Sequence, residues 1–279
     1  KTLHPIKTIT ATAQEISGTD ISKRLKLKGP DDELTKLAST FNSMLNRLEK
    51  AFERQQQFVS DASHELRTPI TVIQGYINLL DRWGKNEKDV REESIEAIKE
   101  EANNMKSLIE GLLFLARGDD DRLDINKKEF LLSELVEEVI QESRMITKKL
   151  KIFSSRIDNI KIYADPELVK QMLRIFIDNS MKYTPVGGEI CINVIDNDYF
   201  AKLIVDDTGM GIPREDIPHI FERFYRVDKS RTDKKGTGLG LAIAKWIIDQ
   251  HDGEVEVESS PGKGTKIVVL LPRTVQKIG

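Results

Sequence analysis

One histidine is the first candidate for chemistry in this sequence. His64 lies in the stretch SDASHELRTPITVI, beside Glu65 and five residues before Pro69. An imidazole changes its charge near neutral pH, so it can take part in proton and group transfer. The chain has only four histidines, and the other three, His4, His219 and His251, are interpreted as structural or surface residues. His64 is therefore either an ordinary surface residue on a long helix or a reaction centre.

Two clusters nearer the C-terminus contain residue types that suit a nucleotide pocket. In DNSMKYT, Asn179, Lys182 and Tyr183 are three and four residues apart, so they share one helix face. An amide oxygen can bind Mg²⁺, an ammonium can meet a phosphate, and a ring can cover a base. In DDTGMGIP, Asp207 could accept a hydrogen bond from a base, and the following glycines permit a sharp turn beside a ligand. These glycines are Gly209 and Gly211.

A third cluster, GTGLGLAIAKWII, places glycines at the start of an apolar helix, where backbone N–H groups can bind phosphate. Its residues are Gly236, Thr237, Gly238, Leu239 and Gly240. The charged segment before it has the length of a lid, and Arg226 could reach a phosphate from there. Each cluster alone is a weak signal. No set of His, Cys, Asp and Glu has the spacing of a structural zinc site.

Apolar periodicity predicts the helices of the first half of the chain. From Leu34 onward, apolar or small residues alternate in steps of three and four, which is typical of a helix that packs along a partner helix. From Leu34 to about Asp81, Pro69 is the only strong breaker. A turn near Gly84 and a second seam over residues 95–116 predict an antiparallel hairpin. Two such hairpins make a four-helix bundle, so a homodimer is expected.

The pattern changes after a polar linker at residues 119–125. FLLSELVEEVIQES and PELVKQMLRIFIDNSMKYT predict helices, and KIFSSRI and KIYAD predict short strands. GEICINVID with YFAKLIVDD, and EVEVES with TKIVVLLP, predict two antiparallel strand pairs. The expected fold class is thus multidomain: an all-α dimeric coiled-coil and four-helix bundle, followed by an α+β two-layer sandwich.

Composition excludes several classes of function. A net charge of −3 and the absence of a basic stripe argue against nucleic-acid binding. The single cysteine, Cys191, cannot form an intramolecular disulfide. No apolar run reaches the roughly 18–20 residues that cross a bilayer. Because the sequence begins at Lys1 rather than methionine, it is interpreted as part of a longer protein.

In their order and spacing, the clusters resemble the ATP-binding domain of sensor histidine kinases, a GHKL-type domain that gyrases and a class of chaperones share in outline. The segment around Asn179 resembles the N box, Asp207–Gly211 the G1 box, FERFYR the F box and GTGLGLAI the G2 box. SSPGKGTKIVVLLP, with Thr265, resembles the glycine–threonine segment that closes the domain. SHELRTP resembles the H box. The resemblance covers essentially the whole chain.

This resemblance implies a domain order. Residues 1–50 would form a HAMP signal-relay domain, and 51–118 the dimerisation and phosphoacceptor hairpin. Residues 119–125 would be a linker, and 126–279 the catalytic ATP-binding domain. The family also implies a cytoplasmic location beneath the plasma membrane, with membrane-spanning segments before Lys1.

The family further implies roles for the matching residues. His64 would accept the γ-phosphoryl group of ATP, Glu65 would act as general base or orient the ring, and Thr68 would position water for dephosphorylating a partner. Asn179 would hold Mg²⁺. The implied ATP-binding residues are Asn179, Lys182, Tyr183, Asp207, Gly209, Gly211, Arg226, Gly236, Thr237, Gly238, Leu239, Gly240 and Thr265.

The implied function is ATP-dependent autophosphorylation on His64, transfer of the phosphoryl group to an aspartate of a response regulator receiver domain, and phosphatase activity toward that regulator. Two alternatives stay open. A GHKL-type ATPase that drives a conformational cycle would leave SHELRTP without a purpose. A catalytically weakened scaffold gains a little support from Ile175, which stands where many family members carry a second asparagine, but His64, Glu65, Asn179 and the glycines are all present. Thr208 also replaces a frequent asparagine, which should matter less.

Overall fold

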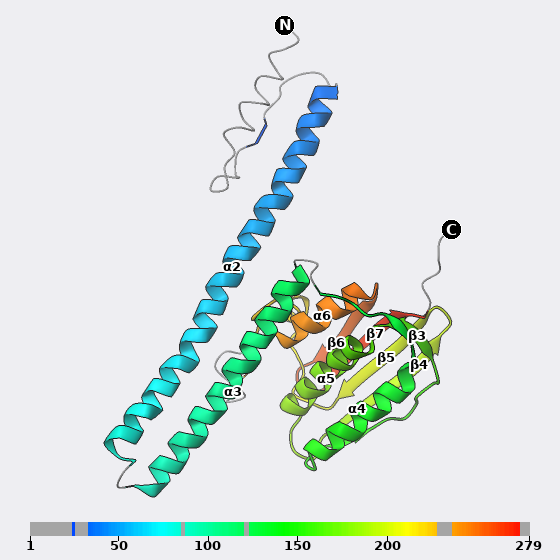
Figure 1. Ribbon diagram of the computed structural model, residues 1–279. Coiled ribbons are helices and arrows are strands. Elements are labelled where there is room, and N and C mark those ends of the chain that lie inside the picture. Colours follow the sequence, from blue (N-terminus) through cyan, green and yellow to red (C-terminus); the bar gives the residue numbers. More distant parts are fainter. Residues whose placement is uncertain (1–23, 26–32, 85–86, 120–122, 228–235, 274–279) are drawn as a thin grey trace. The chain divides into compact units, whose positions relative to one another are not determined.

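The computed structural model describes residues 24–25, 33–84, 87–119, 123–227 and 236–273 (Figure 1). Most of the expected HAMP domain before residue 33, part of the 119–125 linker, the end of the expected lid and His4 lie outside these residues. The chain divides into two compact units, Lys1–Arg67 and Thr68–Gly279. Within the described residues, no helix has both the length and the apolarity that a bilayer crossing requires.

The longest element is the helix α2, Glu33–Arg82, which runs for 50 residues with Pro69 inside it. It confirms the continuous helix expected over residues 34–81. At 1.5 Å per residue it is about 75 Å long. Proline has no N–H, so the carbonyl of Glu65, four residues earlier, lacks its usual helical donor. The ladder of helical hydrogen bonds is thus interrupted one turn after His64.

In the first unit, α2 has two apolar faces with different surroundings. Leu25 is buried against it, and its backbone N–H and C=O both bond the Asn42 amide, at 2.8 and 2.9 Å. Leu45, on this covered face, is only 2% exposed. By contrast, the seam residues Leu37 and Leu48 are 54% and 50% exposed. In the part of the chain that the structure describes, these side chains of the face predicted to meet a partner helix are therefore exposed.

A short connection joins α2 to α3, Lys88–Asp119. The N–H of Gly84 donates to the carbonyl of Leu80 at 3.0 Å, and the guanidinium of Arg91 reaches the Gly84 carbonyl. This confirms the turn expected near Gly84.

The C-terminal part of α3 packs against α6, Gly240–Gln250. The rings of Phe114 and Trp246 meet edge to face with centroids 5.1 Å apart. Two glycines of α3 make room for this contact: a Cβ on Gly118 would lie 2.6 Å from the indole of Trp246, and one on Gly111 would lie 3.2 Å from Leu239. Small residues here set how closely the two helices approach.

Five strands form the main sheet of the second unit, in the order β2-β4-β5-β7-β6. The strands are β2 Lys151–Phe153, β4 Glu189–Asn197, β5 Phe200–Asp207, β6 Glu254–Ser260 and β7 Gly264–Pro272. β2 pairs in parallel with β4, and the other neighbours are antiparallel. The hairpins β4–β5 and β6–β7 were both predicted; the sheet joins them through β5 and β7.

Three helices, α4 (Leu132–Ile146), α5 (Pro166–Tyr183) and α6, cover one face of this sheet (Figure 1). Their apolar faces and the inward side chains of β4 and β5 form the core, which includes Met172, Phe176, Ile192 and Leu203. The predicted α+β two-layer sandwich is confirmed.

One boundary differs from the sequence-based expectation. Phe130 and Leu131 were assigned to a helix, but they belong to the strand β1, Lys128–Leu131, which pairs with β3, Lys161–Ala164. The helix α4 begins only at Leu132, whose N–H donates to Ile160. Pairing with β3 outweighs the helical periodicity, which these apolar residues also satisfy.

His251 is a structural residue, as predicted, and joins three segments. It is 5% exposed; its Nε2 accepts from the backbone N–H of Asp165 at 3.0 Å, and its Nδ1 donates to the carbonyl of Ile247 at 2.7 Å. Asp165 caps α5 through the N–H groups of Glu167 and Leu168. Only a neutral ring can make both contacts. Burial lowers the pKa of His251, and this effect outweighs the hydrogen bond to Ile247, which raises it.

The depressed pKa of His251 predicts acid sensitivity. The unfolded chain protonates this ring below about pH 6.5, whereas the folded chain does so only at lower pH. The stabilisation is therefore complete above about pH 6.5 and is lost as the pH falls through the lowered pKa. We expect His251→Phe to flatten the fall in unfolding free energy between about pH 7 and 5, measured by urea unfolding at each pH. An unchanged slope would contradict this assignment.

The space around two helical glycines predicts opposite effects of substitution. Gly118→Ala forces a methyl group into the Trp246 ring and should destabilise the unit by about 1–3 kcal/mol. A Cβ on Gly75 would meet nothing within 4 Å, so Gly75→Ala should stabilise by up to about 1 kcal/mol. Urea unfolding followed by Trp246 fluorescence, in a Trp83→Phe background, measures both. Equal effects would refute the close packing of α3 on α6.

Candidate functional site

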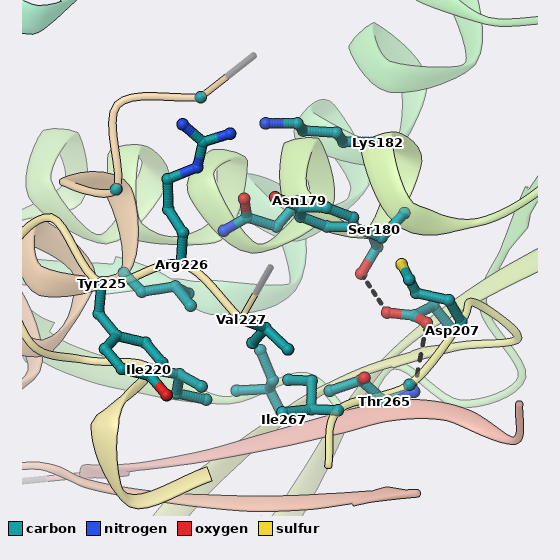
Figure 2. Close-up of a pocket in the computed structure, with 18 of the residues that line it drawn as sticks. Asn179, Ser180, Lys182, Asp207, Ile220, Tyr225, Arg226, Val227, Thr265 and Ile267 are labelled. Atoms are coloured by element: carbon teal, nitrogen blue, oxygen red, sulfur yellow. Dashed lines mark hydrogen bonds between the residues drawn. The ribbon is translucent and has the colours of Figure 1, made fainter. Parts of the chain in front are cut away.

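A pocket of about 460 Å³ lies between α5, the end of β5, the segment 220–227 and the start of α6 (Figure 2). Most of the predicted site residues of this domain line it. They are Asn179, Lys182, Tyr183, Asp207, Gly211, Arg226, Gly236, Thr237, Gly238, Gly240 and Thr265. Sequence reasoning missed the apolar wall, which includes Met210, Ile220, Val227 and Ile267. The pocket thus combines an apolar wall with polar and charged groups.

One end of the pocket is cationic. Lys182 extends from α5 toward the glycine segment, so that a Cβ on Gly236 would lie 2.2 Å from its Nζ. Figure 2 shows the Arg226 guanidinium pointing toward the same end, with the Asn179 amide beside them. The N-terminus of α6 adds backbone N–H groups nearby. Two cations and a helix start favour an anionic ligand group here.

The other end holds a buried carboxylate. Asp207 is 8% exposed at the end of β5. Its Oδ1 accepts from the N–H of Gly209 at 2.8 Å and of Thr265 at 3.2 Å. Its Oδ2 accepts from the Ser180 hydroxyl at 2.8 Å (Figure 2). A buried acid held by three donors has a fixed orientation, which suits recognition of a donor group on a ligand.

Tyr183 also lines the pocket. Burial raises the pKa of its phenol, and the charge of Arg226 opposes this shift. The Lys182 ammonium lies 5.1 Å from the centroid of its ring. A neutral ring at this position can cover a flat apolar ligand group.

Two segments far apart in sequence are joined at the pocket edge by backbone contact. Gly238 has a φ of +69°, and Phe224 also has a positive φ, of +62°. The N–H of Phe224 donates to the Gly238 carbonyl at 2.9 Å, and a Cβ on Gly238 would lie 2.8 Å from the Phe224 backbone. This contact brings Arg226 to the pocket.

Tyr225 is a pocket residue that sequence reasoning did not single out. Its hydroxyl donates to Asp216, and this hydrogen bond raises the pKa of Tyr225 to about 12. The bond fixes the segment before Arg226 to the turn that contains Asp216. The repeated aromatic and arginine residues of FERFYR were the signal, but their spacing does not distinguish which of them faces the pocket.

Two of the predicted ATP-binding residues do not line the pocket. Gly209 supports it from behind, because a Cβ there would lie 2.6 Å from the Asp207 carboxylate and 3.0 Å from the Tyr183 carbonyl. Leu239 is 1% exposed and packs beside Gly111 of α3. The isoleucine at position 175, where many family members carry an asparagine, has a packing role. Its Cγ2 lies 3.3 Å from a Cβ placed on Gly240, so Ile175 contacts the start of α6.

The remaining candidates lie on α2. His64 and Thr68 are both exposed and, being four residues apart, share one helix face. Glu65 is half-buried beside them. In the described part of the chain, no group of three or more His, Cys, Asp or Glu residues could hold a metal ion.

The fold and pocket define a nucleotide-binding domain of the GHKL class, and comparisons with known proteins agree. Residues 164–275 match the histidine kinase-, DNA gyrase B- and HSP90-like ATPases. Residues 54–121 match the His Kinase A (phospho-acceptor) domain, and residues 1–50 match the HAMP domain. The chain belongs to the sensor histidine kinases of two-component systems.

Individual relatives are consistent with this membership. The chain is 40% identical over 269 residues to the sensor histidine kinase YkoH of Bacillus subtilis, and the match covers 96% of this chain and 59% of the relative. The Acinetobacter baumannii histidine kinase AdeS is 25% identical with a TM-score of 0.60, covering 76% of this chain and 98% of that one. Full-length ShkA in complex with AMPPNP is 25% identical with a TM-score of 0.57, and the match covers 78% of this chain and 45% of ShkA. The chain spans about three-fifths of the length of the curated relative.

The backbone contact at Gly238 predicts a loss of nucleotide binding on substitution. Gly238→Ala places a methyl group against the Phe224 backbone and strains a positive φ, so the two segments must separate. Gly262 also has a positive φ, of +75°, but open space around it, so Gly262→Ala controls for backbone strain alone. We expect at least about ten-fold weaker ATP binding for Gly238→Ala only, measured by calorimetry. Similar affinities for both variants would contradict the role of this contact.

Proposed function

We propose that this chain is a protein histidine kinase that binds ATP in the described pocket and phosphorylates His64. The observation that carries the proposal is the polarity of the pocket, with a fixed carboxylate at one end and two cations at the other. A nucleoside triphosphate has the complementary polarity. Its base carries hydrogen-bond donors, and its phosphates carry negative charge.

The base would lie between Tyr183 and the apolar wall, with its exocyclic amino group donating to Asp207. The triphosphate would extend toward Lys182, Arg226 and the N-terminus of α6. The complex of ShkA with AMPPNP, a structural relative, supports a nucleotide of this type.

Asn179 suits Mg²⁺ at the phosphate end. Its amide oxygen is a hard ligand, and Mg²⁺ commonly uses one or two protein oxygens together with phosphates and water. Bound Mg²⁺ would neutralise charge on the phosphates.

For the transfer step, a neutral imidazole nitrogen of His64 attacks the γ-phosphorus while the bond to the β-phosphate bridging oxygen breaks, and ADP leaves. The other ring nitrogen then carries a proton on a cationic ring. Glu65, the next residue in the chain, would accept that proton or hold the ring in the reactive tautomer. The phosphoryl group would pass from His64 to an aspartate of a response regulator receiver domain.

Thr68 lies on the same helix face as His64, four residues later. This placement supports a role in orienting water when the regulator is dephosphorylated, so phosphatase activity is part of the proposal. The match of residues 1–50 to a HAMP domain supports a cytoplasmic position in a sensor of the plasma membrane.

The proposed assembly is a homodimer. The exposed apolar residues of the two long helices would be covered by the same helices of a second copy, in a four-helix bundle. These residues include Leu37, Met44, Leu48, Ile70 and Ile77 of α2 and Ile95 and Ile109 of α3.

Autophosphorylation with labelled ATP and Mg²⁺ tests the function. The unsubstituted chain should gain an acid-labile label that passes to a receiver domain, and His64→Gln should show only background. His219→Gln, at an exposed histidine outside the pocket lining, is the matched control and should label normally. Thr68→Ala should keep the label but lose phosphatase activity.

The outcomes distinguish the alternatives. A stable label on the His64→Gln variant would refute the assigned acceptor. ATP hydrolysis without labelling would indicate a conformational ATPase. ATP binding without hydrolysis or labelling would indicate a scaffold with a weakened site, consistent with Ile175 of α5, which contacts the start of α6.

A further inference from the structure

Ser180 occupies an unusual position for a serine within a helix. It is 3% exposed on α5, and its hydroxyl donates to Asp207 Oδ2, on β5, at 2.8 Å. A helical serine commonly bonds the carbonyl one turn earlier, as Ser143 of α4 does with Val139 at 2.7 Å. Ser180 instead links two different elements at the pocket.

This bond leaves the Asp207 carboxylate with limited acceptor capacity. An ionised carboxylate has about four acceptor positions. Two on Oδ1 are used by the N–H groups of Gly209 and Thr265, and one on Oδ2 is used by Ser180. One position on Oδ2 remains, and both Asp207 and Ser180 line the pocket.

The remaining acceptor position on Asp207 Oδ2 requires a hydrogen-bond donor on the ligand. A 6-amino purine presents an N–H there. A 6-oxo purine would present an oxygen to a carboxylate, and the Ser180 hydroxyl cannot relieve this repulsion because its single proton is donated to Asp207. Sites with fixed polar groups discriminate strongly against ligands that leave those groups unpaired.

We infer that Ser180 is a positioning residue that fixes Asp207 for purines with a 6-amino group, and so sets the preference for ATP over 6-oxo nucleotides. The inference rests on the proposed ATP-binding function. Ser180 follows Asn179 and precedes Lys182 on α5, so one helix carries the phosphate-end residues and also orients the base-end carboxylate.

Binding of ATP and of inosine triphosphate tests the inference, because the two nucleotides differ at the 6-position of the base. Calorimetry uses the full chain with Mg²⁺, in a His64→Gln background that prevents transfer to His64. We expect Ser180→Ala to weaken ATP binding about ten-fold, equivalent to ~1.4 kcal/mol, and to change inosine triphosphate binding less than about two-fold. The ratio of the two affinities is the readout that a merely structural role would not alter.

Two further variants sharpen the test. Ser143→Ala removes an equally buried helical hydroxyl of the same unit and should leave the affinity ratio unchanged, even where thermal stability falls. Asp207→Asn should abolish the preference for ATP. Adding Ser180→Ala to Asp207→Asn should then have little further effect, because Ser180 acts through that carboxylate.

The outcomes are separable. An ATP affinity unchanged by Ser180→Ala, or equal weakening of both nucleotides, overturns the role of Ser180 while ATP binding itself stands. A further large loss on adding Ser180→Ala to Asp207→Asn also overturns it. Failure of the unsubstituted chain to bind ATP overturns the proposed function, and this role with it.

Discussion

A buried carboxylate has to be hydrogen-bonded from several directions, and at Asp207 this requirement organises much of the surrounding unit. Donors reach it from the turn after β5, from the start of β7 and from α5. Gly264 permits the close approach of β7, because a Cβ there would lie 1.8 Å from the Asp207 carbonyl and its φ is +90°. Without these donors the charge would carry a large desolvation penalty.

Close contacts between segments that are distant in sequence also bring the walls of the pocket together. Ser259 of β6 accepts from the N–H of Ile212 at 2.8 Å and contacts the Thr265 hydroxyl, so the turn after β5 is held against the β6–β7 hairpin. On the opposite side, Phe224 and Gly238 meet through a main-chain hydrogen bond. The pocket is thus held together by side-chain hydrogen bonds of Ser259 on one side and by a main-chain hydrogen bond on the other.

Much of this could be predicted from local patterns. The seams of α2 and α3, the paired strands and the clusters around Asn179 and Asp207 are all encoded by short-range periodicity or spacing. Ser180 could not be predicted, because the direction of its hydroxyl depends on a strand 27 residues away. β1 was missed because Phe130 and Leu131 fit a helix equally well until β3 pairs with them.

The place of Leu239 has a thermodynamic consequence. Its neighbours Gly238 and Gly240 border the pocket, while its own side chain packs beside Gly111 of α3. One short segment therefore serves two contacts on opposite sides. If bound nucleotide changes the conformation of this segment, the strength of its attachment to α3 changes with it. Reciprocity then requires that detachment from α3 alter nucleotide affinity by the same factor. Nucleotide binding in the pocket and packing of the segment against α3 would then be linked by a single coupling free energy.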